Sequence, residues 1–149
     1  MAGIMVISED LLRALNLERA CSQVLAEERQ GQDLVPDPLH FLDFESASRQ
    51  IVDELARGLT DGSFRAQRLI RMGVPKNNFC IRPAARPCLK DWVVYHAITN
   101  YLGIKADSKL LPCVYSMRLN PKTGTLEHGT VQWRRFEEAF WADFDKEPR

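Results

Sequence analysis

Several patterns that assign a function quickly are missing from these 149 residues. No stretch approaches the roughly 18 consecutive apolar residues of a membrane span, and acidic residues follow the first apolar stretch too early for a secretory signal. The glycine-rich phosphate loops GxxxxGK(S/T) and GxGxxG are both absent. No internal repeat or low-complexity run is present either. These absences lead us to expect a globular protein of the cytoplasm that makes no membrane contact.

Residues that could act as catalytic groups or metal ligands are few and do not cluster in the sequence. The four cysteines form no CxxC pair, so we expect free thiols and no zinc site. No histidine stands in a recognisable pattern of nucleophile, histidine and acid. Asp143 and Asp145 are the best carboxylate pair, but side chains two residues apart on a helix point in different directions. The sequence therefore predicts no catalytic residue and no metal site in this chain.

Charge is the first positive signal, because a net charge of zero conceals a segregation. Residues 1–60 hold five basic and eleven acidic side chains, whereas residues 64–122 hold eleven basic and two acidic ones. Such an asymmetry predicts a polyanionic partner for the basic part. The alternative is a basic part that folds against the acidic part and neutralises it. Charge counts alone leave both open.

Apolar spacing and turn residues predict an α+β fold, mainly helical, with one or two short antiparallel β-hairpins. Prolines in the first hairpin remove ladder donors, so we expect it to be an exposed edge element. The expected helices cover residues 8–28, 45–58, 89–104 and 130–147, with a linker over 31–38. The expected hairpins pair 68–76 with 79–86, and 110–119 with 125–128 around the turn NPKTG. In the helix 89–104, the expected inward side chains are Leu89, Val93, Ile98 and Leu102.

The last expected helix carries an aromatic stripe whose side chains stand three to four residues apart. Its members are Trp133, Phe136, Phe140 and Phe144. Two interpretations remain open. The stripe closes the core of this chain, or it forms an apolar surface that binds a partner.

Lys76 and Arg82 stand on either side of the Asn-Asn turn expected in the first hairpin. Arginine offers phosphate a planar fork, and lysine offers it a mobile point charge. If the hairpin forms, both side chains can project from it and hold one polyanion between them. The alternative is a solvated hairpin tip, where lysine commonly protects an edge. Arginines beside prolines are less typical of that alternative, which favours phosphate binding.

The stretches IVDELARGLTDGSF and VPKNNFCIRPAARPCLKDWVVYHAITNYLG have a familiar order of features. An expected helix ends in the segment from Leu59 to Phe64. The expected hairpin then contains Pro75-Lys76 and Arg82-Pro83. Asp91 lies at the start of the aliphatic helix that follows. Over residues 45–145, and best over 74–103, this order resembles the N-terminal fingers region of bacterial reverse transcriptases of the group II intron-like and phage-defence kinds. After Phe64 the chain departs from the family, with Arg-Ala-Gln in place of further prolines. The resemblance divides the chain into an N-terminal helix and linker, 1–40, and a fingers-like region, 41–149.

The resemblance also implies roles for particular residues. The hairpin would close over an incoming nucleotide, with Lys76 and Arg82 on its triphosphate, where cations stabilise developing charge. Asp91 would cap its helix or pair with an arginine. Side chains near the template or primer backbone would be Arg71, Arg86 and Lys90, and structural or interface residues would be Trp133, Phe136, Phe140 and Phe144.

The catalytic palm of that family is not recognisable in the sequence. The palm holds Mg²⁺ with an aspartate soon after the fingers helix and with an x-Asp-Asp strand end, and no Asp-Asp pair occurs here. The sequence stops at Arg149, where the first palm strand would begin. We therefore expect Mg²⁺ only through a palm, and no polymerisation by this chain alone.

Three hypotheses follow from the sequence. The first is a fingers segment of a reverse transcriptase (RNA-directed DNA polymerase), with RNA or DNA, nucleotide, and a palm-containing polypeptide or a second copy as partners. The second is a stand-alone nucleic-acid-binding or adaptor module. The third is a helical protein-interaction domain whose basic part neutralises its acidic part. Affinity for nucleic acid that falls steeply with salt would favour the first two.

Overall fold

The computed structural model describes residues 7–30, 38–75, 80–111, 114, 118–120, 122–125 and 129–144. The chain forms two compact units, Met1–Ile98 and Thr99–Arg149, and the boundary between them falls inside one long helix. The described residues are mainly helical with a two-stranded antiparallel hairpin, which confirms the α+β class expected from the sequence. In the part of the chain described, no helix has both the length and the apolarity to cross a membrane.

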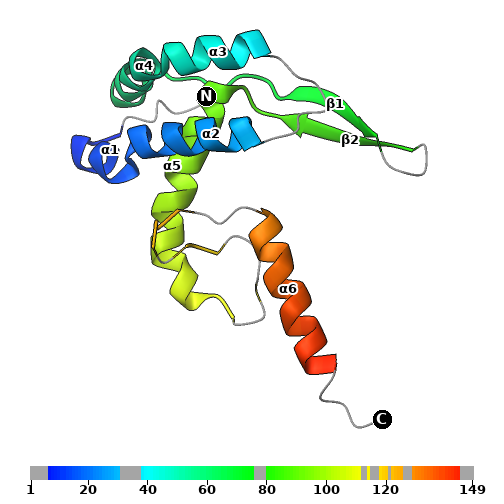
Figure 1. The fold of residues 1–149 in the computed structure, drawn as a ribbon. Helices are drawn as coiled ribbons and strands as arrows, with labels where there is room; N and C mark the ends of the chain where they lie inside the picture. Colours follow the sequence, from blue (N-terminus) through cyan, green and yellow to red (C-terminus); the bar gives the residue numbers. More distant parts are fainter. Residues whose placement is uncertain are drawn as a thin grey trace, which may run out of the picture. The chain divides into compact units, whose positions relative to one another are not determined.

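The first unit is a set of helices from which the hairpin projects (Figure 1). Helix α4 is the common neighbour in this unit, because α1, α2 and α3 all contact it. The elements in chain order are α1 (Glu9–Leu15), α2 (Leu17–Gln30), α3 (Pro38–Ser46), α4 (Ser48–Thr60), β1 (Ile70–Pro75), β2 (Ile81–Arg86) and the first part of α5 (Leu89–Ala106).

A break at Asn16 separates α1 from α2, where the apolar spacing predicted one helix over 8–28. Asn16 adopts the left-handed conformation, with φ at 49°, which asparagine tolerates better than most residues. Its side-chain Oδ1 accepts a hydrogen bond from the backbone N–H of Arg19 at 3.1 Å. Asn16 therefore ends α1 and caps α2. The single-helix prediction was wrong because one residue performs both tasks.

A short helix, α3, precedes α4 and was not expected. It begins at Pro38, in the first helical position, where proline is favoured because the N–H it lacks would have no partner there. The two prolines of residues 31–38 indicated a linker, although the second of them starts a helix. Helix α4 then begins at Ser48, after the single non-helical residue Ala47, and not at 45 as predicted.

The core of the first unit collects apolar side chains from every one of its helices. Leu59 of α4 is 2 % exposed, and Val93 of α5 is fully buried. Burying one side chain of this size is worth about 2 kcal/mol relative to exposure. The other buried apolar residues of this unit are Ile7, Leu15, Leu17, Ala20, Cys21, Val24, Phe44, Ile51, Leu55, Leu89, Val94 and Ala97.

The hairpin pairs β1 with β2 antiparallel, in a register that runs from Ile70↔Arg86 to Pro75↔Ile81. Both strands lie within the ranges predicted from the sequence, 68–76 and 79–86. Residues 76–79, which include Lys76 and the expected Asn-Asn turn, lie outside the described residues. Cross-strand partners share one face of a ribbon, so the register decides which side chains act together.

The second unit contains the rest of α5, the 3-10 helix η1 (Asp107–Lys109) and α6 (Gly129–Phe144). The turn expected at NPKTG is present, because the backbone N–H of Asn120 donates to the carbonyl of Thr125 at 2.9 Å. Much of the second expected hairpin lies outside the described residues.

One core prediction for α5 was wrong. Leu102 was expected to face inward, but it is 53 % exposed. Leu102 follows the buried Val93 by about two and a half turns at 3.6 residues per turn, so it points to the opposite side of the helix. Leu89 and Val93 are buried as expected.

Candidate nucleic-acid interface

Residues 62–90, here called the basic segment, contain seven Lys or Arg side chains and no Asp or Glu. The segment leaves α4 through a turn at Gly62, whose φ of 71° favours glycine, and runs without helix or strand to β1. Hydrogen bonds from the side chain and the backbone N–H of Ser63 hold the pKa of Asp61 below its ordinary value. The basic segment therefore begins at a defined turn.

Asp91 fixes the approach to the hairpin. It lies in the first turn of α5, where a negative charge complements the helix dipole. Its Oδ2 accepts a hydrogen bond from the backbone N–H of Gln67 at 2.8 Å. The resemblance implied that Asp91 caps its helix or pairs with an arginine. Its described partners are the backbone of the basic segment at Gln67 and the thiol of Cys88, the residue that precedes α5.

Arg86 connects the base of the hairpin to the helices. Its guanidinium forms an ion pair with Glu28 of α2, and the two side chains are only 20 % and 14 % exposed. The guanidinium also lies over the ring of Trp92, 5.9 Å from its centroid. Solvent and salt screen such a pair less than a surface pair. Arg86 therefore holds β2 against α2 and α5.

Lys90 connects the start of α5 to α4. Its Nζ donates to a carboxylate oxygen of Glu54 at 2.8 Å, and Gln50 donates to the other oxygen at 2.9 Å. The hydrogen bond from Lys90, and then that from Gln50, hold the pKa of Glu54 below its ordinary value. Arg86 and Lys90 were both expected near a nucleic-acid backbone. At these two positions the basic part of the chain folds against the acidic part.

Other arginines of the basic segment are exposed and not neutralised. Within the described residues, no ion pair includes Arg68, Arg71 or Arg82. Arg65 donates to the backbone carbonyls of Gly62 and Phe64 at 2.7 Å, so its charge meets no carboxylate there. The structure thus presents four exposed guanidinium groups over the start of the segment and the hairpin.

The register places Arg71 and Arg82 on opposite faces of the hairpin. Arg82 pairs with Val74 of β1, so the two side chains share a face. Arg71 is three residues before Val74, and because side chains alternate along a strand, it lies on the other face. Arg82 shares its face with Arg86, four residues along β2, or about 13 Å at the usual rise of a strand. A single phosphate chain on that face can reach Arg82 but not Arg71. Lys76 lies outside the described residues.

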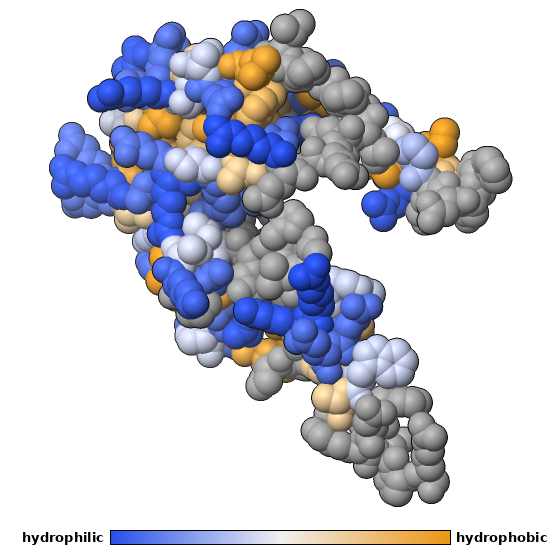
Figure 2. Space-filling view, viewed as in Figure 1, coloured by the Kyte–Doolittle hydropathy of each residue, from blue (hydrophilic) through white to orange (hydrophobic). Residues whose placement is uncertain are grey.

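Exposed apolar side chains lie beside these arginines, at the two ends of the paired strands. Ile81 is 73 % exposed and Ile70 is 54 % exposed. Figure 2 shows apolar and hydrophilic surface side by side on this element. Gly73 leaves room for Ile81, because a Cβ at position 73 would meet Cγ2 of Ile81 at 2.7 Å. Cations beside exposed apolar groups suit a chain of charged phosphates and flat bases.

The aromatic stripe belongs to α6, in the second unit. Ring centroids lie 5.4 Å apart for Trp133 and Phe136, and 6.1 Å apart for Phe136 and Phe140. These side chains are 59 %, 41 % and 50 % exposed in that order. The side chain of Phe144 lies outside the described residues. Trp141, which was not singled out from the sequence, is 56 % exposed and packs edge-on against Phe140.

The remaining reactive side chains are possible metal ligands and cysteine thiols. The described residues contain no group of three or more His, Cys, Asp or Glu side chains placed to hold a metal. Cys21, Cys80 and Cys88 are free thiols. Burial raises the pKa of the Cys21 and Cys88 thiols.

The sequence did not identify Glu28, Glu54 or Gln67 as partners of the basic segment or of α5. They reach Arg86, Lys90 and Asp91 across 58, 36 and 24 positions of the chain. No local spacing indicates a contact over such distances. The only signal was the opposite charge of the two halves, which left the pairs unspecified.

No family model, curated protein or solved structure matches this chain.

Proposed function

We propose that this chain binds the phosphates of nucleic acid and of a nucleotide through its basic segment, as the fingers region of a reverse-transcriptase-like protein. Arg82, together with Lys76, would contact a triphosphate on one face of the hairpin. Arg71 and Arg68 would contact a template or primer backbone. The role is to bind and orient, and chemistry would require the carboxylates and Mg²⁺ of a palm. We place this role in the cytoplasm, where free thiols persist.

The observation that supports the proposal is the exposed and unneutralised charge of the basic segment. Arg68, Arg71 and Arg82 are exposed and form no ion pair within the described residues. The absence of acidic side chains over 62–90 means that no carboxylate of the segment repels a phosphate. Charge of this kind supplies most of the affinity of sequence-independent nucleic-acid binding.

Arg86 and Lys90 have a different place in the proposal. Each is already paired with a carboxylate, Glu28 or Glu54, which offsets its charge toward a phosphate. Their proposed contribution is to hold the hairpin and α5 in position. Direct contact with the backbone is left to the exposed arginines.

The test is binding of a fluorescent single-stranded oligonucleotide, long enough to turn around the hairpin and reach both Arg71 and Arg82, over a series of salt concentrations. We expect the logarithm of affinity to fall linearly with the logarithm of salt concentration. Arg71→Ala and Arg82→Ala should each weaken binding and reduce the slope by about 0.7. The matched control is Arg49→Ala, an exposed arginine of α4 outside the basic segment. If the control and the two variants bind alike, the proposal is wrong.

A second candidate is a protein-interaction domain, including one that associates with a copy of itself. The exposure of Trp133 and Trp141 on α6, 59 % and 56 %, favours it. Absence of oligonucleotide binding at low salt, together with concentration-dependent sedimentation that Trp133→Gln abolishes, would select this function over the first.

A further inference from the structure

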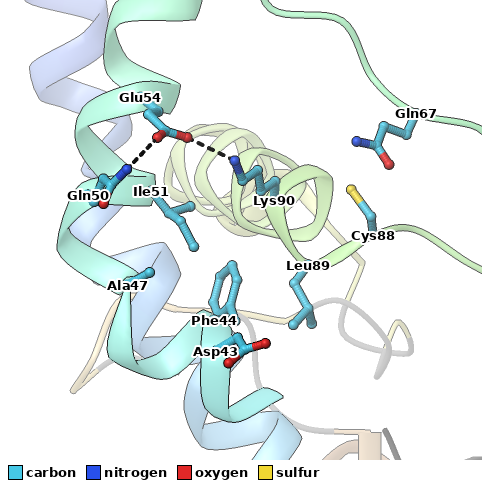
Figure 3. Close-up of a pocket in the computed structure, with 10 residues that line it drawn as sticks. All are labelled: Asp43, Phe44, Ala47, Gln50, Ile51, Glu54, Gln67, Cys88, Leu89 and Lys90. Atoms are coloured by element: carbon cyan, nitrogen blue, oxygen red, sulfur yellow. Dashed lines mark hydrogen bonds and ion pairs between the residues drawn. The ribbon is translucent and has the colours of Figure 1, made fainter. Parts of the chain in front are cut away.

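A pocket lies beside the basic segment, between α3, α4 and the start of α5 (Figure 3). Its volume of about 340 Å³ falls in the range of small-ligand sites. The buried side chains of Phe44, Ile51 and Leu89 give it an apolar floor. The pocket therefore suits a flat apolar group of one-ring or two-ring size.

One wall of the pocket is polar and already ordered. Glu54 accepts hydrogen bonds from both Lys90 and Gln50, as the dashed lines of Figure 3 show. These bonds use the Gln50 amide nitrogen and leave its amide oxygen as an acceptor. The wall thus keeps its shape without a ligand and still offers an acceptor.

Two further polar groups line the pocket without such bonds. The side-chain amide of Gln67 forms no hydrogen bond to another described residue, because only its backbone N–H is bonded to Asp91. It can donate and accept. The carboxylate of Asp43 can only accept when ionised. Together these groups match the edge of a nucleobase, which carries donors and acceptors around an apolar face.

We propose that this pocket binds one unstacked base of a single-stranded nucleic acid whose phosphates lie along the basic segment. The inference rests on the proposed function. Its geometric support is continuity, since Gln67 stands in the chain between Arg65 and Arg68, both exposed and cationic. A strand held by these arginines passes the mouth of the pocket. Stacking and edge contacts would hold one of its bases there.

The acceptor groups also predict which bases fit. Asp43 and the oxygen of Gln50 can together accept both N–H groups of an exocyclic amino group, which adenine, cytosine and guanine have, whereas thymine offers only its single ring N3–H. Oligodeoxyadenylate should therefore bind more tightly than oligothymidylate. Asp43→Asn adds a hydrogen-bond donor at the same place. It should therefore reduce the difference in affinity between oligodeoxyadenylate and oligothymidylate.

The main experiment compares a short oligodeoxyadenylate with an abasic oligomer of equal phosphate number, using the full chain. We expect the abasic oligomer to bind about tenfold more weakly. Ala47→Met extends an apolar side chain into the pocket and should weaken only the oligomer that has bases. Ala14→Met, at an exposed position of α1, is the matched control. It should leave unchanged the difference in affinity between oligodeoxyadenylate and the abasic oligomer.

A second measurement uses the unaltered chain, in case Ala47→Met fails to fold. Cys88 lines the pocket, whereas exposed Cys80 lies next to β2 and outside it. Oligodeoxyadenylate should slow the alkylation of Cys88 severalfold, and the abasic oligomer should not. Both oligomers should slow the alkylation of Cys80.

Several results would overturn the inference. Equal binding of both oligomers, weakened alike by Arg71→Ala, would exclude the base pocket and leave the proposed function intact. Failure of either oligomer to bind would exclude both. Protection of Cys88 by N-acetylphenylalaninamide but not by adenosine would assign the pocket to a polypeptide side chain.

Discussion

Arg86 forms a largely buried ion pair, so its loss should clearly destabilise the first unit. Replacing Arg86 by Ala leaves the carboxylate of Glu28, which is 14 % exposed, without its ion pair. We expect a loss of about 2–3 kcal/mol in the free energy of unfolding, measured by urea denaturation. The matched control is Arg13→Ala, whose partners Glu9 and Asp10 are on the surface, and it should cost less than about 0.5 kcal/mol.

The double variant Arg86→Ala/Glu28→Ala tests the reason for that loss. Removing both charges also removes the cost of an uncompensated carboxylate, so the double variant should be more stable than Arg86→Ala alone. A double variant less stable than the single one would mean that Glu28 stabilises the fold independently of Arg86.

Lys90 and Glu54 predict a dependence of stability on pH. The hydrogen bond from Lys90 lowers the pKa of Glu54 in the folded state, so the folded state binds a proton less readily than the unfolded one. The stabilisation is complete above the unfolded pKa, above about pH 5, and is lost as pH falls through the folded pKa. Lys90→Met should therefore lower stability at neutral pH and have little effect in strong acid. Thermal unfolding across pH measures this, with Lys122→Met, an exposed lysine of the second unit, as the control.

At the scale of elements, the junction between α1 and α2 depends on one conformation. Asn16 has φ at 49° and caps α2 through Arg19. Asn16→Ala loses the cap and places in the left-handed region a residue that tolerates it less well than asparagine, which we expect to cost about 1–2 kcal/mol. Asn16→Gly loses only the side-chain bond and should cost less. Equal losses in the two variants, measured by circular dichroism in urea, would contradict this account of the break.

Elements with a strong local signal were predictable from the sequence. Two short extended runs on either side of an Asn-Asn pair predicted the hairpin, and the aliphatic run after Asp91 predicted α5. The break at Asn16 was missed because periodicity does not register a single left-handed residue. Helix α3 is not evident from the sequence because a proline such as Pro38 is equally typical of a linker and of the first position of a helix.

The candidate site was predictable only in part, for a related reason. The exposed arginines could be found because charge is visible in the sequence. Which cations are neutralised depends on tertiary contacts, and Glu28 and Glu54 come from helices far earlier in the chain. The pocket combines residues of α3, α4 and α5 with Gln67. No spacing within one element could have indicated it.

At the scale of the whole molecule, the division into two units predicts two levels of protection against hydrogen exchange. Val93→Ala removes two methyl groups from the core of the first unit, at a cost of about 2 kcal/mol. Amides of α1, α2 and α4 should then exchange about thirtyfold faster, if the unit opens cooperatively. Amides of α6, in the second unit, should be unaffected, and hydrogen exchange with mass spectrometry measures both. Equal acceleration in α6 would mean that the chain opens as one body.

The register of the hairpin limits the shape of whatever lies against it. Arg71 and Arg82 are on opposite faces of a two-stranded ribbon. A polyanion confined to one side leaves the other arginine in solvent. Only two phosphate chains, or one chain that turns around the ribbon, can occupy both. If the proposed function holds, a hairpin with both arginines engaged would act as a wedge between two negatively charged strands, and we expect a forked or sharply bent ligand to bind it more tightly than a straight strand.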